Sequence, residues 1–375
     1  MGKRIVLAGG GHAHMTVMVN SHVFQKEGHQ VTLISPSPHH YYSGMGPGML
    51  SGIYKPQEIR FNVQKMIETR NGRFVQDRVI RIDTEQKRLI LNSGSAVDYD
   101  VASFNVGSAI PSDFAGETGE NVFSVKPIIN LLKAREVILR WPEGKSLKIL
   151  VAGGGPAGVE IVGNLWRLTR NRKAATEIIL VAGTKLLKRC PEKVYGIARK
   201  SLNRRGIDVI ERAHVAKTAD GEVMLTDGRK IDYNIAFLSS GVKPPSLFRD
   251  SGIPAEEDGG MLVNQYLQSI SHPEIFGGGD CISLQGHRLE KVGVYAVREN
   301  PVLFHNLLAF AQGEKLKPFD PGGSYLLIFN LGDSTGIFWR GSSVWNGRPA
   351  FFLKDFIDRR FMRKFQVSGE RDEEL

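Results

Sequence analysis

The run Ala152-Gly153-Gly154-Gly155-Pro156-Ala157-Gly158-Val159-Glu160 decides the fold. The apolar run 146–152 before it is typical of a β-strand, and the run 159–170 after it is typical of a helix. In a Gly-x-Gly-x-x-Gly turn the first glycine permits the tight turn, the second lets a pyrophosphate approach the backbone, and the third allows close helix–strand packing. The run therefore predicts a Rossmann-type unit with Gly153, Gly155 and Gly158 at a dinucleotide.

A second copy of the pattern lies about 145 residues earlier. A strand-like run at 4–8 leads into three consecutive glycines at 9–11, and a helical stretch follows to about residue 23. Gly9 and Gly11 match the first two positions of the pattern, but His14 stands at the third. His14 implies either looser helix–strand packing or an imidazole that contacts the ligand.

Both copies lack the acid that commonly ends the second strand and binds a ribose hydroxyl. In the first copy Ser35 ends the strand-like run 30–35, and its hydroxyl can bond a ribose more weakly. In the second copy the position is Ala182 or Gly183. Three basic residues follow, Lys185, Lys188 and Arg189. They could favour a 2′-phosphate or could be ordinary surface charge, so the choice between NADH and NADPH stays open.

The remaining pattern divides the chain into three parts. Strand-like runs at 73–83, 88–91 and 99–106 suggest an antiparallel excursion from the first unit, and the apolar run 234–239 suggests a return to it. We expect an α/β fold with two Rossmann-like nucleotide-binding domains, the second inserted in the first, and a C-terminal region with an amphipathic helix. The expected domains are 1–110 with 233–323, then 111–232, then 324–375.

Composition narrows the function classes. A chain of 375 residues is long for one core, and no apolar run reaches the roughly 18–20 residues that cross a bilayer. The net charge of +10 suits an anionic partner, but no zinc finger or RNA-recognition signature is present, so we expect no nucleic acid. Only two cysteines occur, which suits a reducing compartment, and we expect no metal site.

A third glycine-rich turn follows a strand-like run and reads Gly277-Gly278-Gly279-Asp280. A carboxylate in this position can accept hydrogen bonds from the ribityl hydroxyls of a flavin. As an isolated tetrapeptide the signal is weak, and its place after two dinucleotide turns gives it weight.

Four features in order carry a resemblance: Gly9-x-Gly11, Gly153–Glu160, Ser240-Gly241-x-x-Pro244 and Gly279-Asp280-Cys281. Over most of the chain they resemble the flavoproteins with two dinucleotide-binding domains, the pyridine nucleotide–disulfide oxidoreductase superfamily. The resemblance implies FAD in domain 1–110 with 233–323 and NADH or NADPH in domain 111–232. The implied FAD-binding residues are Gly9, Gly11, His12, His14, Ser35, Tyr42, Ser43, Gly44, Gly107, Gly279 and Asp280.

Within the superfamily the chain is most similar to type II NADH dehydrogenases, to sulfide:quinone oxidoreductases and to the flavoprotein module fused to selenide, water dikinase. No cysteine precedes Cys190, so the Cys-x4-Cys pair of disulfide reductases is absent. Cys190 and Cys281 do not match the paired cysteines of the sulfide enzymes. The type II route from nicotinamide to flavin to quinone needs no cysteine, and a quinone is therefore the expected acceptor.

The likeness to type II enzymes is imperfect. Asn164 replaces a second acid in the helix after the nucleotide turn, and Val294 and Arg298 occupy the approximate positions of two quinone-site glutamines. Two residues are expected to act in catalysis. Glu160 would help to seat the nicotinamide, and Lys291 would stabilise the anionic reduced flavin unless it is an ordinary surface lysine.

The segment Phe351–Phe365 has apolar residues at helical spacing. The expected apolar face is Leu353, Phe356, Ile357, Phe361 and Phe365, and the flanking cations are Lys354, Arg359, Arg363 and Lys364. A basic amphipathic helix can lie in a lipid headgroup layer, or it can dock on its own core or on a second subunit of a homodimer. We expect a cytoplasmic protein that can bind the inner face of the cell membrane peripherally.

Two rival functions remain open. One is a flavin oxidoreductase that acts on sulfur or selenium compounds. The other is a flavin-binding module with little turnover, which the missing acids at Ser35 and Ala182 keep in view.

Overall fold

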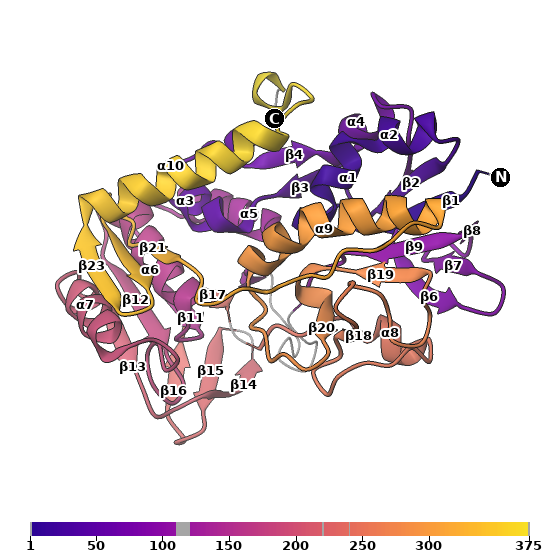
Figure 1. The fold of residues 1–375 in the computed structure, drawn as a ribbon. Coiled ribbons are helices and arrows are strands. Elements are labelled where there is room, and N and C mark those ends of the chain that lie inside the picture. Colours follow the sequence, from indigo (N-terminus) through magenta and orange to yellow (C-terminus); the bar gives the residue numbers. More distant parts are fainter. Residues whose placement is uncertain (1, 110–120, 220, 240, 374–375) are drawn as a thin grey trace.

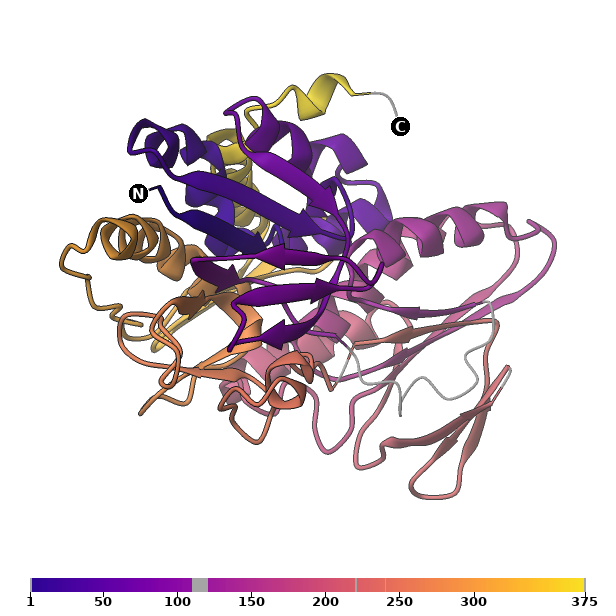
Figure 2. The same ribbon diagram turned by 90° about the vertical axis from the view of Figure 1, so that its right-hand side faces the viewer.

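The computed structural model describes residues 2–109, 121–219, 221–239 and 241–373. Two parallel five-stranded sheets form the centres of two Rossmann-type units that lie side by side (Figure 1, Figure 2). The first sheet has the order β19 (Ile275–Gly277), β9 (Val101–Phe104), β1 (Arg4–Ala8), β2 (Gln30–Ser35) and β5 (Arg73–Gln76). The second has the order β10 (Val122–Ser124), β17 (Ile235–Leu238), β11 (Leu147–Ala152), β12 (Thr176–Val181) and β13 (Asp208–Ile210).

The second sheet lies between β9 and β19 along the chain, so the predicted insertion of one Rossmann unit into the other is confirmed. The central strands β9, β11 and β17 are apolar and almost wholly buried, as expected for parallel strands covered on both faces. Both glycine turns sit at the carboxyl end of a central strand, β1 or β11, where open α/β sheets bind their ligands.

One strand lies in a different unit from the one we predicted. The run 234–239 was expected to return to the first domain, yet β17 pairs in parallel with β11 and β10 of the second sheet. An all-apolar strand carries no sign of which buried sheet it joins, so the sequence pattern could not distinguish the two. The predicted domain boundary at residues 232–233 is therefore wrong at this strand.

The helices complete the two units. Those built mainly on the first unit are α1 (Met15–Val19), α2 (Ser21–Lys26), α4 (Val63–Glu68), α8 (Leu247–Asp250) and α9 (Gly293–Gln312). Those of the second unit are α5 (Ile129–Arg140), α6 (Pro156–Thr169) and α7 (Glu192–Asn203). Helix α3 (Gly46–Ser51) packs on α5 and α6 and so connects the units. The short 3-10 helices are η1 (His12–His14), η2 (Ser43–Met45), η3 (Pro56–Glu58), η5 (Gly279–Cys281) and η6 (Glu370–Asp372).

Small sheets surround the two large ones. The antiparallel sheets are β6 (Val79–Asp83), β7 (Arg88–Leu91) and β8 (Ala96–Asp98); β14 (Val215–Ala219), β15 (Glu222–Leu225) and β16 (Lys230–Asp232); β21 (Leu327–Asn330), β22 (Gly336–Arg340) and β23 (Ser343–Gly347); and β3 (His39–Tyr41) with β4 (Arg60–Asn62). Strands β18 (Met261–Val263) and β20 (Ile282–Leu284) pair in parallel. The expected antiparallel excursion is confined to β6–β8, because β5 and β9 belong to the parallel sheet.

Helix α10 (Arg348–Phe365) lies across the top of both units (Figure 1). It begins at β23 beside the second unit and ends near β4 of the first unit. The part of the chain that the structure describes contains no helix long and apolar enough to cross a membrane.

Candidate functional site

The first glycine turn is closed by one asparagine. Gly9 has a φ of +91°, and a Cβ there would lie 2.3 Å from the carbonyl oxygen of Asn105. A Cβ on Gly11 would lie 2.1 Å from Asn105 Oδ1. The Asn105 side chain accepts a hydrogen bond from Ala13 N at 3.0 Å and donates one to Gly278 O at 2.6 Å. Asn105, which the sequence analysis missed, thus joins the first glycine turn to the Gly-Gly-Gly-Asp turn.

His14 fills the place of the third glycine by packing. Its ring is fully buried, with Nδ1 2.7 Å from Gly9 O and Nε2 2.8 Å from Ser103 Oγ. Burial lowers the pKa of His14 to about 4, so the ring is neutral at physiological pH. Because protein groups satisfy both ring nitrogens, the structure favours a packing role over contact with a ligand.

A cluster of rings lies beside the turn. The His12 ring has its centroid 4.9 Å from that of His40, 5.2 Å from that of Tyr42 and 5.7 Å from that of Phe361. Burial, with smaller effects of His40 and Lys126, holds the pKa of His12 well below its usual range. Gly44 gives Tyr42 room, since a Cβ on Gly44 would lie 2.9 Å from the Tyr42 ring. Three expected residues of the first site, His12, Tyr42 and Gly44, therefore lie together.

The Asp280 carboxylate faces a lysine that the sequence analysis missed. Asp280 Oδ2 accepts a hydrogen bond from Ser108 Oγ at 2.7 Å and forms an ion pair with Lys126, which also donates to Ser108 Oγ at 2.8 Å. Nothing in the sequence around Lys126 marks it as a site residue. The neighbouring Gly279 has a φ of +73° and donates its N–H to Glu299 Oε2 at 2.5 Å. Burial raises the pKa of Glu299 to about 7.

The other expected residues of the first site border the same region. Gly107 has a φ of +70°, and a Cβ there would meet open space. Ser43 faces the start of α9, where a Cβ on Gly293 would lie 3.6 Å from Ser43 Oγ. Ser35 ends β2, is buried, and donates its hydroxyl to Ser37 O at 3.0 Å.

The second glycine turn has the geometry of a complete fingerprint. A Cβ on Gly158 would lie 1.8 Å from Gly153 O, so this position requires glycine for helix–strand contact. Gly153 has a φ of +131°, which side chains rarely adopt. A Cβ on Gly155 would meet nothing within 4 Å, so the backbone is open on the side where a pyrophosphate would approach. The turn thus has the close helix–strand contact at Gly158 and the open backbone at Gly155 that the fingerprint pattern requires.

The basic residues after β12 are mostly paired with acids. Lys185 Nζ lies 2.7 Å from Glu192 Oε2, and Arg189 lies 3.3 Å from Glu290 Oε1. Ala182 is buried and Gly183 has a φ of +70°. These pairs support ordinary surface charge for Lys185 and Arg189 over recognition of a 2′-phosphate.

Glu160 is half-buried, and the charge of Lys354 on α10 acts on it. Its Oε1 accepts a hydrogen bond from Asn330 N at 2.7 Å, and its backbone carbonyl accepts one from Asn164 Nδ2 at 2.8 Å. Burial raises the pKa of Glu160 to about 7, against the opposing effects of the Lys354 charge and the Asn330 hydrogen bond. A carboxyl group with this pKa can take up and release a proton at physiological pH.

Lys354 and Asp358 were not expected at the site. Lys354 Nζ lies 2.8 Å from Asp358 Oδ2 and donates to Gly44 O at 2.7 Å, and Tyr42 Oη donates to Asp358 Oδ1 at 3.0 Å. Lys354 was expected among the cations that flank the apolar face, yet its side chain is buried in an ion pair. Tyr42 of the first unit thus bonds to α10, and the charge of Lys354 on the same helix acts on Glu160 of the second unit. The signal was available as a lysine and an aspartate one helical turn apart.

The Lys291 side chain contacts β20 and Asp258. Its Nζ lies 2.5 Å from Ile282 O, 3.0 Å from Ser283 Oγ and 3.1 Å from Asp258 Oδ2. The Lys291 ammonium is therefore bound by β20 and by Asp258. Because only 17% of the Lys291 side chain is exposed, the interpretation as an ordinary surface lysine is excluded. Arg298, at the position of a quinone-site glutamine, donates to Pro321 O.

The two cysteines are poor nucleophiles. Burial raises the pKa of Cys190 to about 11 and that of Cys281 to about 12, so both remain thiols at physiological pH. Cys281 lies in the third glycine turn with its Sγ 3.3 Å from Gly278 O.

The buried face of α10 differs from the expected one. Phe356 and Ile357, assigned to the apolar face, are 56% and 39% exposed, and Phe352 is 60% exposed. The buried face instead carries Phe351, Lys354, Asp358, Met362 and Phe365. The helix thus docks on its own protein through a mixed apolar and charged face and leaves a second apolar stripe in solvent.

Arg359 was expected to flank the apolar face as a free cation. It lies 2.8 Å from Glu58 Oε1 and 2.9 Å from Asp355 Oδ1. The motif Ser240-Gly241-x-x-Pro244 begins at Ser240, which lies outside the described residues.

The fold and the two glycine turns define an oxidoreductase with two Rossmann units. Residues 3–305 match the pyridine nucleotide-disulphide oxidoreductase family, and the chain belongs to it. This confirms the superfamily that the sequence analysis expected.

A curated relative and two solved structures are similar to the chain over nearly its whole length. The chain is 24% identical over 402 residues to the type II NADH:quinone oxidoreductase of Staphylococcus aureus, covering 98% of this chain and 96% of that one. NDH2 from Plasmodium falciparum, solved in complex with NADH, has a similar fold with a TM-score of 0.81 at 15% identity, covering 99% and 98% of the two chains. The sulfide:quinone oxidoreductase of Aquifex aeolicus has a TM-score of 0.79 at 16% identity, covering 98% and 92%.

Proposed function

We propose that this protein is an FAD-dependent NADH dehydrogenase that passes electrons to a quinone. The observation that carries the proposal is a polar cluster at the junction of the two units: Tyr42 and Lys354 both bond to Asp358, and the charge of Lys354 acts on Glu160. Family membership and the likeness to type II NADH:quinone oxidoreductases support the same reaction.

The residues around the first turn fit FAD. Gly9, Gly11 and the N-terminus of η1 would hold the pyrophosphate, and Asp280 with Lys126 would meet the ribityl and flavin end. Bound FAD would supply the redox chemistry, since it can accept a hydride and pass electrons onward. His12 and Tyr42 would exclude water beside it with their rings. Lys291, whose ammonium is bound to β20, remains the proposed partner of the reduced flavin.

The residues around the second turn fit NADH. Gly153, Gly155 and Gly158 would hold its pyrophosphate at the N-terminus of α6, and Glu160 on the first turns of α6 would seat the nicotinamide. With a pKa of about 7, Glu160 can also hold the proton that accompanies reduction of a quinone, while Lys354 stabilises its ionised form. We keep domain 111–232, extended to include β17, as the NADH domain.

The cofactor can be tested with one substitution. We expect the purified protein to be yellow, and we expect Asp280→Ala to lose FAD more readily than wild type. A charge-assisted hydrogen bond of this kind contributes about 1.5–3 kcal/mol, which corresponds to at least a tenfold weaker affinity. Flavin absorbance after dialysis measures the loss. A wild-type protein that stays colourless with excess FAD would refute the assignment.

The donor can be tested by anaerobic reduction. NADH should bleach the bound flavin of wild type, and Gly155→Val should slow this at least tenfold while FAD stays bound. The branched side chain fills the open space where the pyrophosphate approaches the backbone. Glu136→Gln, on the exposed side of α5, is the matched control. Equal bleaching rates in Gly155→Val and wild type would exclude this turn as the donor site.

The second candidate is an enzyme that acts on sulfur compounds, and the fold likeness to a sulfide:quinone oxidoreductase is the observation that favours it. The raised pKa values of both cysteines weigh against it. Reduction of the flavin by sulfide in the absence of NADH would favour this candidate.

The exposed stripe of α10 supports peripheral contact with the inner face of the cell membrane, where a lipid-soluble quinone is met. Phe352, Phe356 and Ile357 would enter the headgroup layer, with Arg360, Arg363 and Lys364 at the anionic surface. A homodimer through the same stripe is the other possibility, and sedimentation without lipid distinguishes the two.

A further inference from the structure

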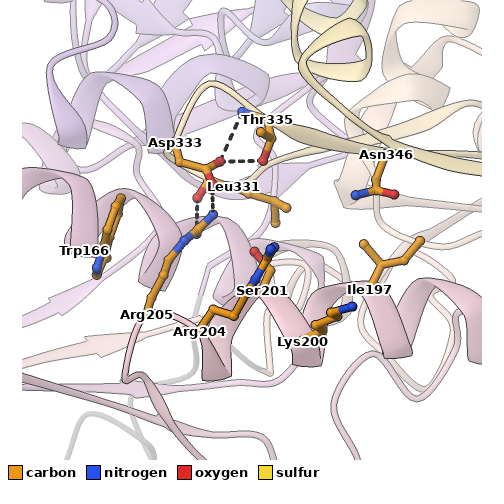
Figure 3. Close-up of a pocket in the computed structure, with 10 residues that line it drawn as sticks. All are labelled: Trp166, Ile197, Lys200, Ser201, Arg204, Arg205, Leu331, Asp333, Thr335 and Asn346. Atoms are coloured by element: carbon orange, nitrogen blue, oxygen red, sulfur yellow. Dashed lines mark hydrogen bonds and ion pairs between the residues drawn. The ribbon is translucent and has the colours of Figure 1, made fainter.

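A pocket of about 560 Å³ lies away from both glycine turns, between α7 of the second unit and the β21–β23 sheet of the C-terminal region. Figure 3 shows the basic side chains and Ser201 on one side, facing Asp333, Thr335 and Asn346 on the other. The helix side contributes Lys200, Ser201, Arg204 and Arg205, the last two just beyond the C-terminus of α7. None of these residues belongs to the proposed redox site.

Two of the three cations are unpaired. Arg205 already has partners in the protein. It forms an ion pair with Asp333, donates a hydrogen bond to Leu331 O at 2.5 Å and stacks on Trp166 with 5.0 Å to the ring centroid. Lys200 and Arg204 are exposed, and in the described part of the chain no carboxylate lies within ion-pairing distance of either. They give the pocket a positive charge that the protein does not neutralise.

Ser201 provides a second, independent observation. The residue is 2% exposed and lies between the two cations in sequence, and its Oγ has no hydrogen-bond partner in the structure. A buried hydroxyl without a partner costs free energy, so a hydrogen-bonding group that enters the pocket would stabilise it. An anionic oxygen flanked by Lys200 and Arg204 is such a group.

A neighbouring pocket of about 400 Å³ provides a comparison. It shares Trp166 and Arg205 and also has basic residues in its lining. There, however, Arg172 donates to Trp141 O and Pro142 O, and Lys173 pairs with Glu143 at 3.0 Å. In the described residues the second pocket keeps one unpaired cation, Arg170, and one hydroxyl without a partner, that of the half-buried Thr176. The first pocket differs in having two unpaired cations beside a hydroxyl on a fully buried residue, Ser201.

We propose that the pocket at Lys200, Ser201 and Arg204 binds the phosphate group of a small phosphate ester. A phosphate dianion accepts several hydrogen bonds and suits two cations and a hydroxyl donor in one pocket. The volume leaves room for an organic part beyond the phosphate, and Asn346 and Thr335 across the pocket offer it polar contacts. Asp333 lies in the wall, but Arg205 neutralises it.

The position of the pocket connects it to the redox site. Its wall residue Leu331 follows Asn330, whose N–H holds the Glu160 carboxylate. The same loop approaches α6 closely, since a Cβ on Gly163 would lie 2.5 Å from Leu331 O. A phosphate ester that shifts Leu331 would thus alter the hydrogen bond that stabilises ionised Glu160.

The test uses the full chain with FAD bound and inorganic phosphate as the probe, titrated by calorimetry at constant ionic strength. We expect millimolar or tighter binding to wild type and at least tenfold weaker binding to Lys200→Ala/Arg204→Ala. Lys193→Ala removes an exposed charge from the same helix outside the pocket and should bind like wild type. Equal affinity in the double variant would assign the phosphate to the glycine turns and overturn the proposal, as would no binding to wild type.

A second arm identifies the source of the phosphate. Wild type and the double variant are sedimented with phosphatidylglycerol vesicles. A loss of sedimentation in the double variant alone would assign the pocket to a lipid headgroup, and unchanged sedimentation would assign it to a soluble ester. Because binding is measured without turnover, the proposal stands or falls independently of the proposed reaction. Melting curves of the double variant check that it is folded.

Discussion

Glu160 shows how one half-buried carboxyl group can make stability depend on pH. Its pKa is raised to about 7, mainly by burial, from a usual value near 4.5. A carboxyl group with a raised pKa contributes stability that is fully present below about pH 4.5 and is lost as the pH rises through about 7. Lys354 and the Asn330 N–H moderate this loss but do not abolish it.

We therefore expect Glu160→Gln to be more stable than wild type at pH 8 and similar to it at pH 5. The difference at pH 8 should be at most about 3 kcal/mol, since one pKa unit corresponds to about 1.4 kcal/mol. Denaturant unfolding at the two pH values measures it, with Glu136→Gln as the exposed control. If the free energy of unfolding changes with pH in the same way in Glu160→Gln and in wild type, Glu160 is already ionised at low pH. Turnover of Glu160→Gln should also lose any pH dependence centred near 7.

At the level of single residues, the sequence predicted those whose backbone geometry dictates their type. Gly9, Gly153 and Gly158 could be assigned because positive φ angles and close contacts leave no other choice. Asn105 and Lys126 could not, because their roles arise from contacts with turns far away in the sequence. Such residues carry no local pattern.

The secondary-structure elements likewise divide into those that the sequence predicted and those that it missed. The strands at 4–8, 30–35 and 88–91 were predicted with their observed bounds, because each is apolar or alternating and ends at a turn signal. Short strands such as β10 and β18 were missed, since three residues carry no usable periodicity. No element was predicted in the segment 36–52, yet it contains β3 and α3.

Helix α10 was predicted as an element but with the wrong face. The apolar residues alone could not reveal that a Lys354–Asp358 pair would be buried, because an isolated buried charge is unfavourable and only the pairing makes it tolerable. Consequently, truncation at Pro349 would remove Phe351, Met362 and Phe365 from the core and would not isolate membrane binding.

The exposed stripe of α10 gives a cleaner test of membrane binding. Phe352→Ser/Phe356→Ser should leave the melting temperature and flavin content unchanged and should weaken sedimentation with anionic vesicles at least tenfold. Two aromatic side chains that leave water contribute on the order of 1.5–3 kcal/mol each when fully desolvated, and less when partly inserted. Leu139→Ser, an exposed apolar residue on α5, is the control. If wild type does not sediment with anionic vesicles at low salt, peripheral membrane binding is contradicted.

On the scale of the whole molecule, α10 and its flanking segments hold the two units together. Its N-terminal end follows the β21–β23 sheet, which Arg205 and Asp333 tie to the second unit. Its C-terminal end leads to Glu370 and Glu373 on the first unit, where Glu370 accepts hydrogen bonds from the backbone of Asn62 and Ser368. We call α10 and its flanking segments, from β21 to η6, the strap. We infer that the strap fixes the distance between the two glycine turns.

Glu373 is the main anchor of this strap. Its carboxylate lies 2.9 Å from Arg60, 3.0 Å from Lys65 and 3.0 Å from His39 Nε2, and it accepts a hydrogen bond from Asn62 Nδ2 at 2.6 Å. Burial opposes ionisation of the group, but the combined hydrogen bonds from Asn62, Lys65 and His39 lower its pKa to about 2. A lowered pKa means that the stabilisation is present above about pH 4.5 and is lost as the pH falls through about 2.

We expect Glu373→Gln to loosen the strap while both Rossmann units stay folded. At neutral pH the variant should show faster amide hydrogen exchange over α10 and at the residue 330 loop, a lower melting temperature and faster loss of FAD. As the pH approaches 2 the difference in stability from wild type should shrink, because the wild-type carboxylate is then protonated as well. Glu85→Gln, an exposed acid between β6 and β7 of the first unit, is the control. Unchanged exchange in α10 would mean that the helix is held by its buried face alone and that Glu373 does not anchor it.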